Sequence, residues 1–188
     1  MNDINNTEYI FHNEFEPTFL IFSKPGINFT CYVWSRDLIQ EFYCKISGYL
    51  FTINCIYNED FIAIEDKAYP LMFMFRNTLE LCFKRFLYKF KNHEREKSHR
   101  IIKTLWEKTK AIILTYNNSD KDIIFIEEQL KIIDSIDKEG DTFRYPTSKN
   151  LDYTFNNKTI DLKNIYNCFY AIINFIQAYE DAIEYSNE

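Results

Sequence analysis

The fold is decided by the stretch LMFMFRNTLELCFKRFLY, which occupies residues 71–88. Apolar side chains lie on nearly every face of a helix drawn through it, and a helix that is hydrophobic almost all round is a central, buried one. The exception is a polar row at i, i+4 and i+8, formed by Arg76, Glu80 and Lys84. We therefore predict a central helix from about residue 69 to residue 88, with Pro70 in its first turn, where proline is tolerated.

Helical periodicity continues on both sides of this stretch, because apolar residues recur every three or four positions in four more segments. The predicted helices cover about 36–57 after an N-cap at Ser35, 99–116 after an N-cap at Ser98, 122–136, and 162–185 after Asp161. Residues 1–34 differ, since two β-prone runs surround the turn signal Lys24-Pro25-Gly26. We expect one domain over residues 1–188. It is all-α in the main, an up-and-down bundle of about five helices over 35–188, with a small β hairpin or extended arm over 1–34.

Composition excludes several classes of protein. The chain has 188 residues, of which 46% are hydrophobic and 18% aromatic, too apolar for a disordered protein. No apolar run approaches the roughly 18 residues that a spanning helix needs, and the first 17 residues contain no Lys or Arg for a signal peptide. We expect a cytoplasmic protein with no membrane partner. Its 5 cysteines are scattered and never in CxxC spacing, so we expect buried thiols rather than disulfides or a zinc site.

Charge is distributed unevenly along the chain. The formal net charge is −6, but the stretch between Lys84 and Lys110 holds ten basic residues against three acidic ones. A protein that binds nucleic acid over a broad surface is seldom so acidic overall. Two interpretations of this stretch stay open, a local basic face and an ordinary solvated pair of helices with surface lysines.

Three pieces of the sequence carry a family resemblance: YPLMFMFRNTLELCFK at 69–84, SHRIIKTLW at 98–106, and DKEGDTFRYP at 137–146. In this order they resemble a group of bacterial HEPN-like proteins (higher eukaryotes and prokaryotes nucleotide-binding). The resemblance implies a helical bundle that forms a homodimer. It also implies association with RNA cleavage or nucleotide binding in toxin–antitoxin and phage-defence systems.

The chain departs from the ribonucleases of that superfamily, which carry Arg-x(4–6)-His. Here Arg95 and His99 are separated by three residues, and Arg85 and His93 by seven. We therefore expect a non-catalytic module that binds a nucleotide, RNA or a protein partner in bacterial defence or stress response. One alternative is a metal-independent endoribonuclease toxin. The other is an antitoxin or phage anti-defence interaction protein.

Candidate site residues follow from the chemistry of RNA cleavage without metal, which needs a base near the 2′-OH and a cation on the phosphate. His99 is the candidate base, just inside a predicted helix N-terminus that attracts anions. Arg76 and Lys84 are candidate phosphate-binding cations on the central helix, with Glu80 between them. Arg144 and Tyr145 stand in the loop that follows Gly140 and are further candidates for binding an anion or nucleotide. We expect this loop to close over the end of the groove beside Arg76 and Lys84.

A plainer hypothesis makes the same residues structural. Arg76, Glu80 and Lys84 then form an intrahelical ion-pair ladder, and His99 bonds to a carboxylate or a loop carbonyl. If instead they bind a ligand, we predict a pocket with Arg76, Glu80 and Arg144 within a few ångströms and His99 at its rim. We expect no metal and no cofactor, because the chain has 3 histidines and its paired acids read as helix-surface residues: Asp134, Asp137, Glu127 and Glu128.

Overall fold

The computed structural model describes residues 37–117, 121–137, 142–143 and 159–186. The chain divides into two units, 1–34 and 35–188, and every described residue belongs to the second. The described part consists of five α-helices and one π-helical turn, and no strand occurs in it, so the all-α prediction is confirmed there. The predicted N-terminal hairpin or arm lies outside the described residues.

Helix α1 (Leu38–Asn58) begins close to its predicted start but with a different cap. Asp37, rather than the expected Ser35, accepts a hydrogen bond from the Ile39 N–H. At the other end, the buried Lys67 side chain donates to the carbonyl oxygens of Tyr57 and Glu59. An ammonium group there satisfies carbonyls that have no helical partner and complements the helix dipole.

Helix α2 (Ile64–Phe90) starts five residues earlier than predicted, with Pro70 inside it. The sequence argument treated the proline as a first-turn residue and so placed the start at Tyr69. Glu65 and Asp66 lie in the true first turn, where the helix dipole favours acids. This turn extends the helix on the N-terminal side of Pro70. The N–H groups of Asp66 and Lys67 bond to the Ala63 carbonyl, which fixes the start of the helix.

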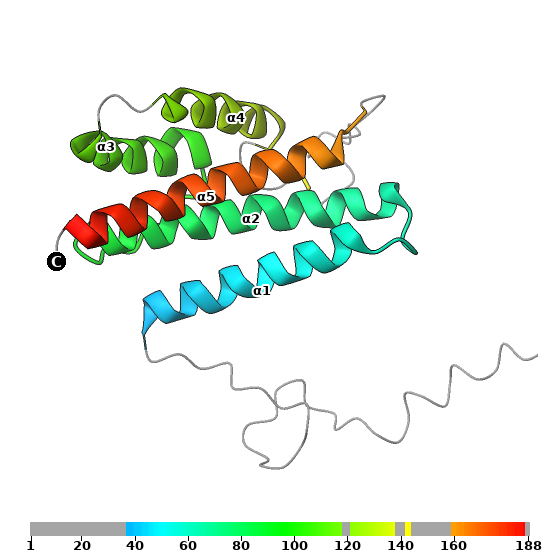
Figure 1. The fold of residues 1–188 in the computed structure, drawn as a ribbon, viewed down its shortest axis with the longest axis horizontal. Coiled ribbons are helices and arrows are strands. Elements are labelled where there is room, and N and C mark those ends of the chain that lie inside the picture. The colour runs from blue at the N-terminus through cyan, green and yellow to red at the C-terminus, as the bar shows by residue number, and fades with distance from the viewer. Residues whose placement is uncertain (1–36, 118–120, 138–141, 144–158, 187–188) are drawn as a thin grey trace, which may run out of the picture. The chain divides into compact units, whose positions relative to one another are not determined.

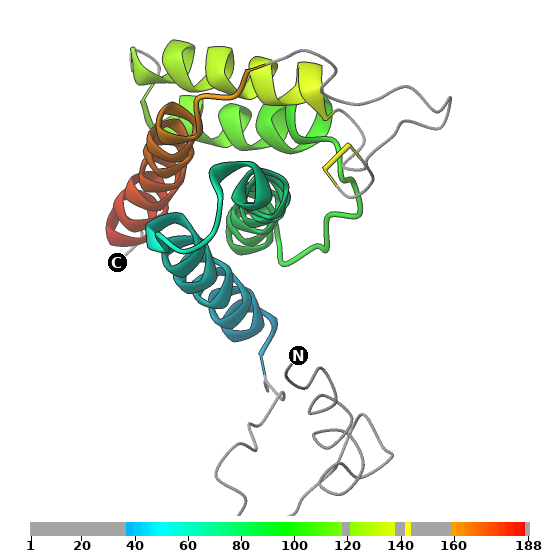
Figure 2. The ribbon, with the colours of Figure 1, turned by 90° about the vertical axis from the view of Figure 1, so that its right-hand side faces the viewer.

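The predicted central position of α2 is correct. Seen along its length, α2 has α1, α5 and the α3–α4 layer around it (Figure 2), and it contacts α1, α5, the π-helical turn and α3. Its side chains form much of one continuous core, in which Phe83, Leu105 and Trp106 are fully buried. Phe83 and Trp106 meet edge to face with ring centroids 6.1 Å apart.

The segment after α2 runs back along this helix before the next helix begins. A connector, which we define as residues 91–100, leads to the π-helical turn η1 (Ile101–Trp106) and then to α3 (Glu107–Tyr116). The start of η1 lies beside the middle of α2, since Arg76 bonds to the His99 carbonyl, and the end of α3 lies beside the end of α2. α3 therefore runs parallel to α2, and the connector returns along α2 to make this possible (Figure 1).

The last two helices match their predicted limits closely. They are α4 (Asp122–Ile136) and α5 (Leu162–Ser186), and the Asp161 carboxylate accepts a hydrogen bond from the Asn164 N–H at the start of α5. None of the described helices is long and apolar enough to cross a membrane.

The cysteine prediction is wrong in part. The four cysteines in the described part form no disulfide, as expected, but only Cys82 is fully buried there. Cys44 and Cys55 are exposed because they lie on the face of α1 that turns away from α2, and Cys168 is partly buried.

Candidate functional site

The polar row of α2 forms the predicted intrahelical ladder. Glu80 receives Arg76 Nη1 at 2.5 Å on one oxygen and Lys84 Nζ at 2.8 Å on the other. Because residues four apart on a helix lie one above the other, the three side chains need no bend in the backbone to meet. The ladder is largely withdrawn from water, and the Arg76 side chain is 3% exposed.

His99 joins this ladder from the end of the connector. Its Nδ1 lies 2.7 Å from Glu80 Oε1, and its backbone carbonyl accepts a hydrogen bond from Arg76 Nη2. The His99 side chain is 67% exposed, so its ring forms the rim of the group while Arg76 forms the floor. The predicted approach of His99 to the Arg76 row is therefore present in the structure.

Asp137 completes the group, although the sequence analysis treated it as a surface acid. It follows α4, its side chain is 1% exposed, and its Oδ2 lies 3.5 Å from Arg76 Nε. Its other oxygen accepts a hydrogen bond from the Thr142 N–H at 3.0 Å. The Asp137 carboxylate faces the inner side of the Arg76 guanidinium, so each of these buried charges has an opposite charge beside it. We call Arg76, Glu80, Lys84, His99 and Asp137 the Arg76 cluster.

The charges within the Arg76 cluster balance. Arg76 and Lys84 supply two positive charges, and Glu80 and Asp137 supply two negative ones. Burial alone would raise the pKa of Glu80, but the hydrogen bond and charge of Lys84, the bond to His99 and the charge of Arg76 outweigh it. The pKa of Glu80 is consequently lowered, and the carboxylate stays ionised between its partners.

Two predicted site residues lie outside the described residues, namely Arg144 and Tyr145. The predicted pocket is therefore described only for Arg76, Glu80 and His99. Phe143, immediately before Arg144, is buried in the core, and the Thr142 hydroxyl bonds to the Ile136 carbonyl at 3.0 Å.

Much of the basic stretch between residues 84 and 110 is paired with acids. Lys84 binds Glu80, Arg85 binds Glu180, Lys89 binds Glu184, Lys108 binds Glu96, and Lys110 binds Glu127. The connector contrasts with these helical residues. Its basic side chains are exposed at every odd-numbered position, namely Lys91, His93, Arg95, Lys97 and His99.

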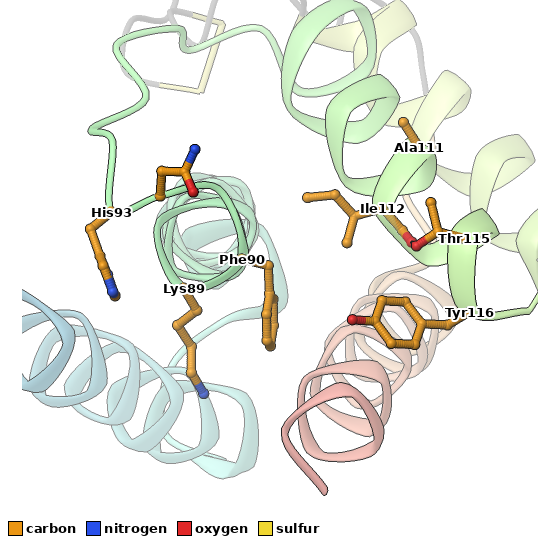
Figure 3. A pocket seen from close by; sticks show the side chains of 8 residues that line it. Lys89, Phe90, His93, Ala111, Ile112, Thr115 and Tyr116 are labelled. Atoms are coloured by element: carbon orange, nitrogen blue, oxygen red, sulfur yellow. The ribbon is translucent and has the colours of Figure 1, made fainter. Parts of the chain in front are cut away.

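A pocket of about 600 Å³ lies at the start of the connector, between the ends of α2 and α3. Phe90 points into the gap from the α2 side, and Ile112 and Tyr116 point into it from the α3 side (Figure 3). Asn92 and His93 of the connector also line it, and both have left-handed backbone angles, with φ values of 50° and 57°. Sequence analysis did not predict this pocket, whose walls come from two helices and the connector that joins them.

Two further polar groups were also missed. Arg85 of α2 forms a buried ion pair with Glu180 of α5, and the sequence signal was an acid within the apolar stripe of α5, between Ile176 and Ile183. Glu127, expected on the surface, is partly buried and binds Lys110 and Lys131. These contacts and that of the Trp106 indole lower the pKa of Glu127 to about 2.

Comparison with known proteins adds no assignment. The chain matches no family model, no curated protein and no solved structure. The resemblance to HEPN-like proteins therefore stays a prediction from the three sequence pieces. Within the described residues, no group of three or more His, Cys, Asp or Glu side chains is placed to hold a metal ion.

Proposed function

We propose that this chain is a non-catalytic module that binds RNA, with the connector and His99 as its contact surface. One observation carries the proposal: the connector exposes basic side chains, whereas the cations of the Arg76 cluster are matched by buried carboxylates. An exposed cation is available to a phosphate, whereas a buried, paired one is not. The setting in bacterial defence or stress response rests on the HEPN-like resemblance alone.

The geometry of the Arg76 cluster favours binding over cleavage. Cleavage of RNA without metal needs a cation on the reacting phosphate close to the base. Arg76 is a candidate cation for this role, yet its Nη atoms bond to Glu80 and to the His99 carbonyl, and its Nε lies 3.5 Å from the Asp137 carboxylate. The Nδ1 atom of His99 is likewise occupied by Glu80, which leaves the exposed edge of its ring for a ligand.

Fluorescence anisotropy with a labelled single-stranded RNA in EDTA tests the proposal. We expect saturable binding that weakens with salt, and full-length RNA on a denaturing gel after the titration. Intact RNA with no change in anisotropy would refute binding. If the wild-type protein shortens the RNA and the His99→Ala variant leaves it full-length, the endoribonuclease alternative is supported instead.

A second candidate function, binding of a protein partner, is favoured by the turn between α1 and α2. Phe61 is 98% exposed there, and Ile62 and Ile64 are also exposed. Four acids surround them in the sequence, at positions 59, 60, 65 and 66. An apolar tip rimmed by acids suits a protein with a basic-rimmed apolar groove. Light scattering of wild type and Phe61→Ser tests whether the partner is a second copy of this chain. A homodimer formed through this tip would be present in wild type and lost in the Phe61→Ser variant.

A further inference from the structure

We infer that the connector binds single-stranded RNA in an extended form, with phosphates on its odd-numbered basic residues and one base in the pocket between Phe90 and Tyr116. This inference rests on the proposed function and adds to it the form of the ligand, its path along the connector and its two kinds of contact. It places the strand along α2, from the pocket at one end of the connector to His99 at the other.

The connector alternates between outward and inward side chains over its second half. Arg95, Lys97 and His99 are exposed, whereas the residues between and after them, Glu96, Ser98 and Arg100, are partly buried. Such alternation is the signature of an extended backbone, in which successive side chains point to opposite sides. All three outward residues are basic, so one side of the connector is a row of cations.

Inward contacts hold the connector in this extended form. Glu96 binds Lys108 of α3, and the Ser98 hydroxyl accepts a hydrogen bond from the Arg100 N–H. The His99 carbonyl is held by Arg76. A row of cations that is already ordered loses less entropy on binding than a mobile loop would.

The spacing of the row suits a single strand. Residues two apart in an extended chain are separated by about 6.6 Å. A single strand carries one phosphate charge per nucleotide, so a strand that follows the connector can place successive phosphates along this row. Glu94, the exposed acid of the connector, precedes the three alternating cations Arg95, Lys97 and His99.

The pocket supplies a contact that other polyanions cannot make. Phe90 and Tyr116 present aromatic surface from opposite walls, and Tyr116 is 49% exposed (Figure 3). Bases stack on such side chains whatever their sequence. Asn92 and His93 line the pocket, and the rest of the connector follows them directly. A base in the pocket therefore leaves its phosphate next to the first cations of the row.

Salt titration of wild-type protein against a single-stranded RNA tests the row. Each phosphate contact on a single strand contributes about −0.7 to the slope of log K against log salt, so Lys91, Arg95 and Lys97 together predict a slope near −2 or steeper. Arg95→Ala and Lys97→Ala should each reduce the slope by about 0.7. The matched control, Lys163→Ala, removes an exposed lysine of α5 and should leave it unchanged.

Inorganic polyphosphate, which has charges but no bases, tests the pocket. Tyr116→Ala should weaken RNA binding several-fold or more, as loss of a stacking contact does, and leave polyphosphate binding unchanged. Phe125→Ala, which removes a similarly exposed ring from α4, is the control. Equal effects of Tyr116→Ala on both polymers would overturn the base pocket, and slopes unaffected by Arg95→Ala and Lys97→Ala would overturn the row. If either result is found and the wild-type protein still binds RNA, the proposed function stands without this inference. If the wild-type protein does not bind RNA at all, the proposed function and this inference are both refuted.

Discussion

Arg85 of α2 and Glu180 of α5 form a buried two-point ion pair across the bundle. Arg85 Nη2 lies 2.9 Å from one Glu180 oxygen, and Arg85 Nε lies 3.0 Å from the other. The Arg85 guanidinium also stacks over the Tyr43 ring of α1, 4.4 Å from its centroid, and bonds to Gln177 at 2.8 Å. Burial raises the pKa of Glu180 in spite of Arg85, because water no longer solvates the carboxylate. One arginine thus joins three helices.

Removing one partner of this pair should destabilise the protein far more than removing both. Arg85→Met or Glu180→Met leaves an unpaired buried charge, and we expect each to cost about 3–5 kcal/mol in the free energy of unfolding. The double variant replaces both charges by apolar side chains, so it should recover most of that loss. Urea denaturation of the four proteins measures the coupling, and additive losses would show that the two side chains act independently.

Acid should unfold the protein partly through Glu80 and Glu127. Their pKa values are lowered in the folded state, so each contributes stability above its ordinary value of 4.5 and loses it as the pH falls through the folded value. For Glu127 this window runs from about 4.5 down to about 2. Glu127→Gln should lower the free energy of unfolding at pH 7 by roughly 1 kcal/mol, after allowance for the partial exposure of Glu127. The variant should also lose less stability than the wild type as the pH falls below 4.5. Thermal melts at a series of pH values check this, with exposed Glu128→Gln as the control.

The cysteines of the described part should react with a thiol reagent in a definite order. Cys44 and Cys55 are exposed and should react within minutes in the native protein. Cys82 is buried, and this burial raises its pKa to about 12, so it should react only on unfolding. Mass spectrometry of the labelled peptides checks the order. Rapid native labelling of Cys82 would mean that α2 is not the core helix.

Emptying the core should have a large effect at Phe83 and Leu105. Both are fully buried against α2 or η1, and we expect replacement of either by Ala to cost about 3 kcal/mol. Leu114→Ala, in the exposed part of α3, should cost well under 1 kcal/mol. Chemical denaturation of the three variants checks this. If the Phe83 and Leu105 variants were as stable as the wild type, these side chains would not lie in the core.

The helical class and most helix limits could be predicted from the sequence because amphipathic periodicity is a local property. The start of α2 could not, since Pro70 stands inside the helix and an interior proline resembles a first-turn one. The direction of α3 was also beyond reach. It depends on how the connector packs, and the Glu96–Lys108 pair between the connector and α3 joins residues of unremarkable surface type.

The Arg76 cluster shows the same division. Its row on α2 was predictable because Arg76, Glu80 and Lys84 follow helical spacing, and His99 was predicted at the rim of the same group. Asp137 was missed because an acid after a helix ordinarily faces water. Its burial depends on a contact between helices that are far apart in the sequence, and no local pattern reports such a contact.

Lysine footprinting tests the binding surface most directly. The full-length protein is acetylated briefly with and without a single-stranded RNA, and the modified lysines are quantified by mass spectrometry. The account predicts that RNA protects Lys91 and Lys97 of the connector, whereas the exposed Lys121 and Lys163 react equally in both samples. Protection of Lys121 or Lys163 with continued labelling of Lys91 and Lys97 would contradict it.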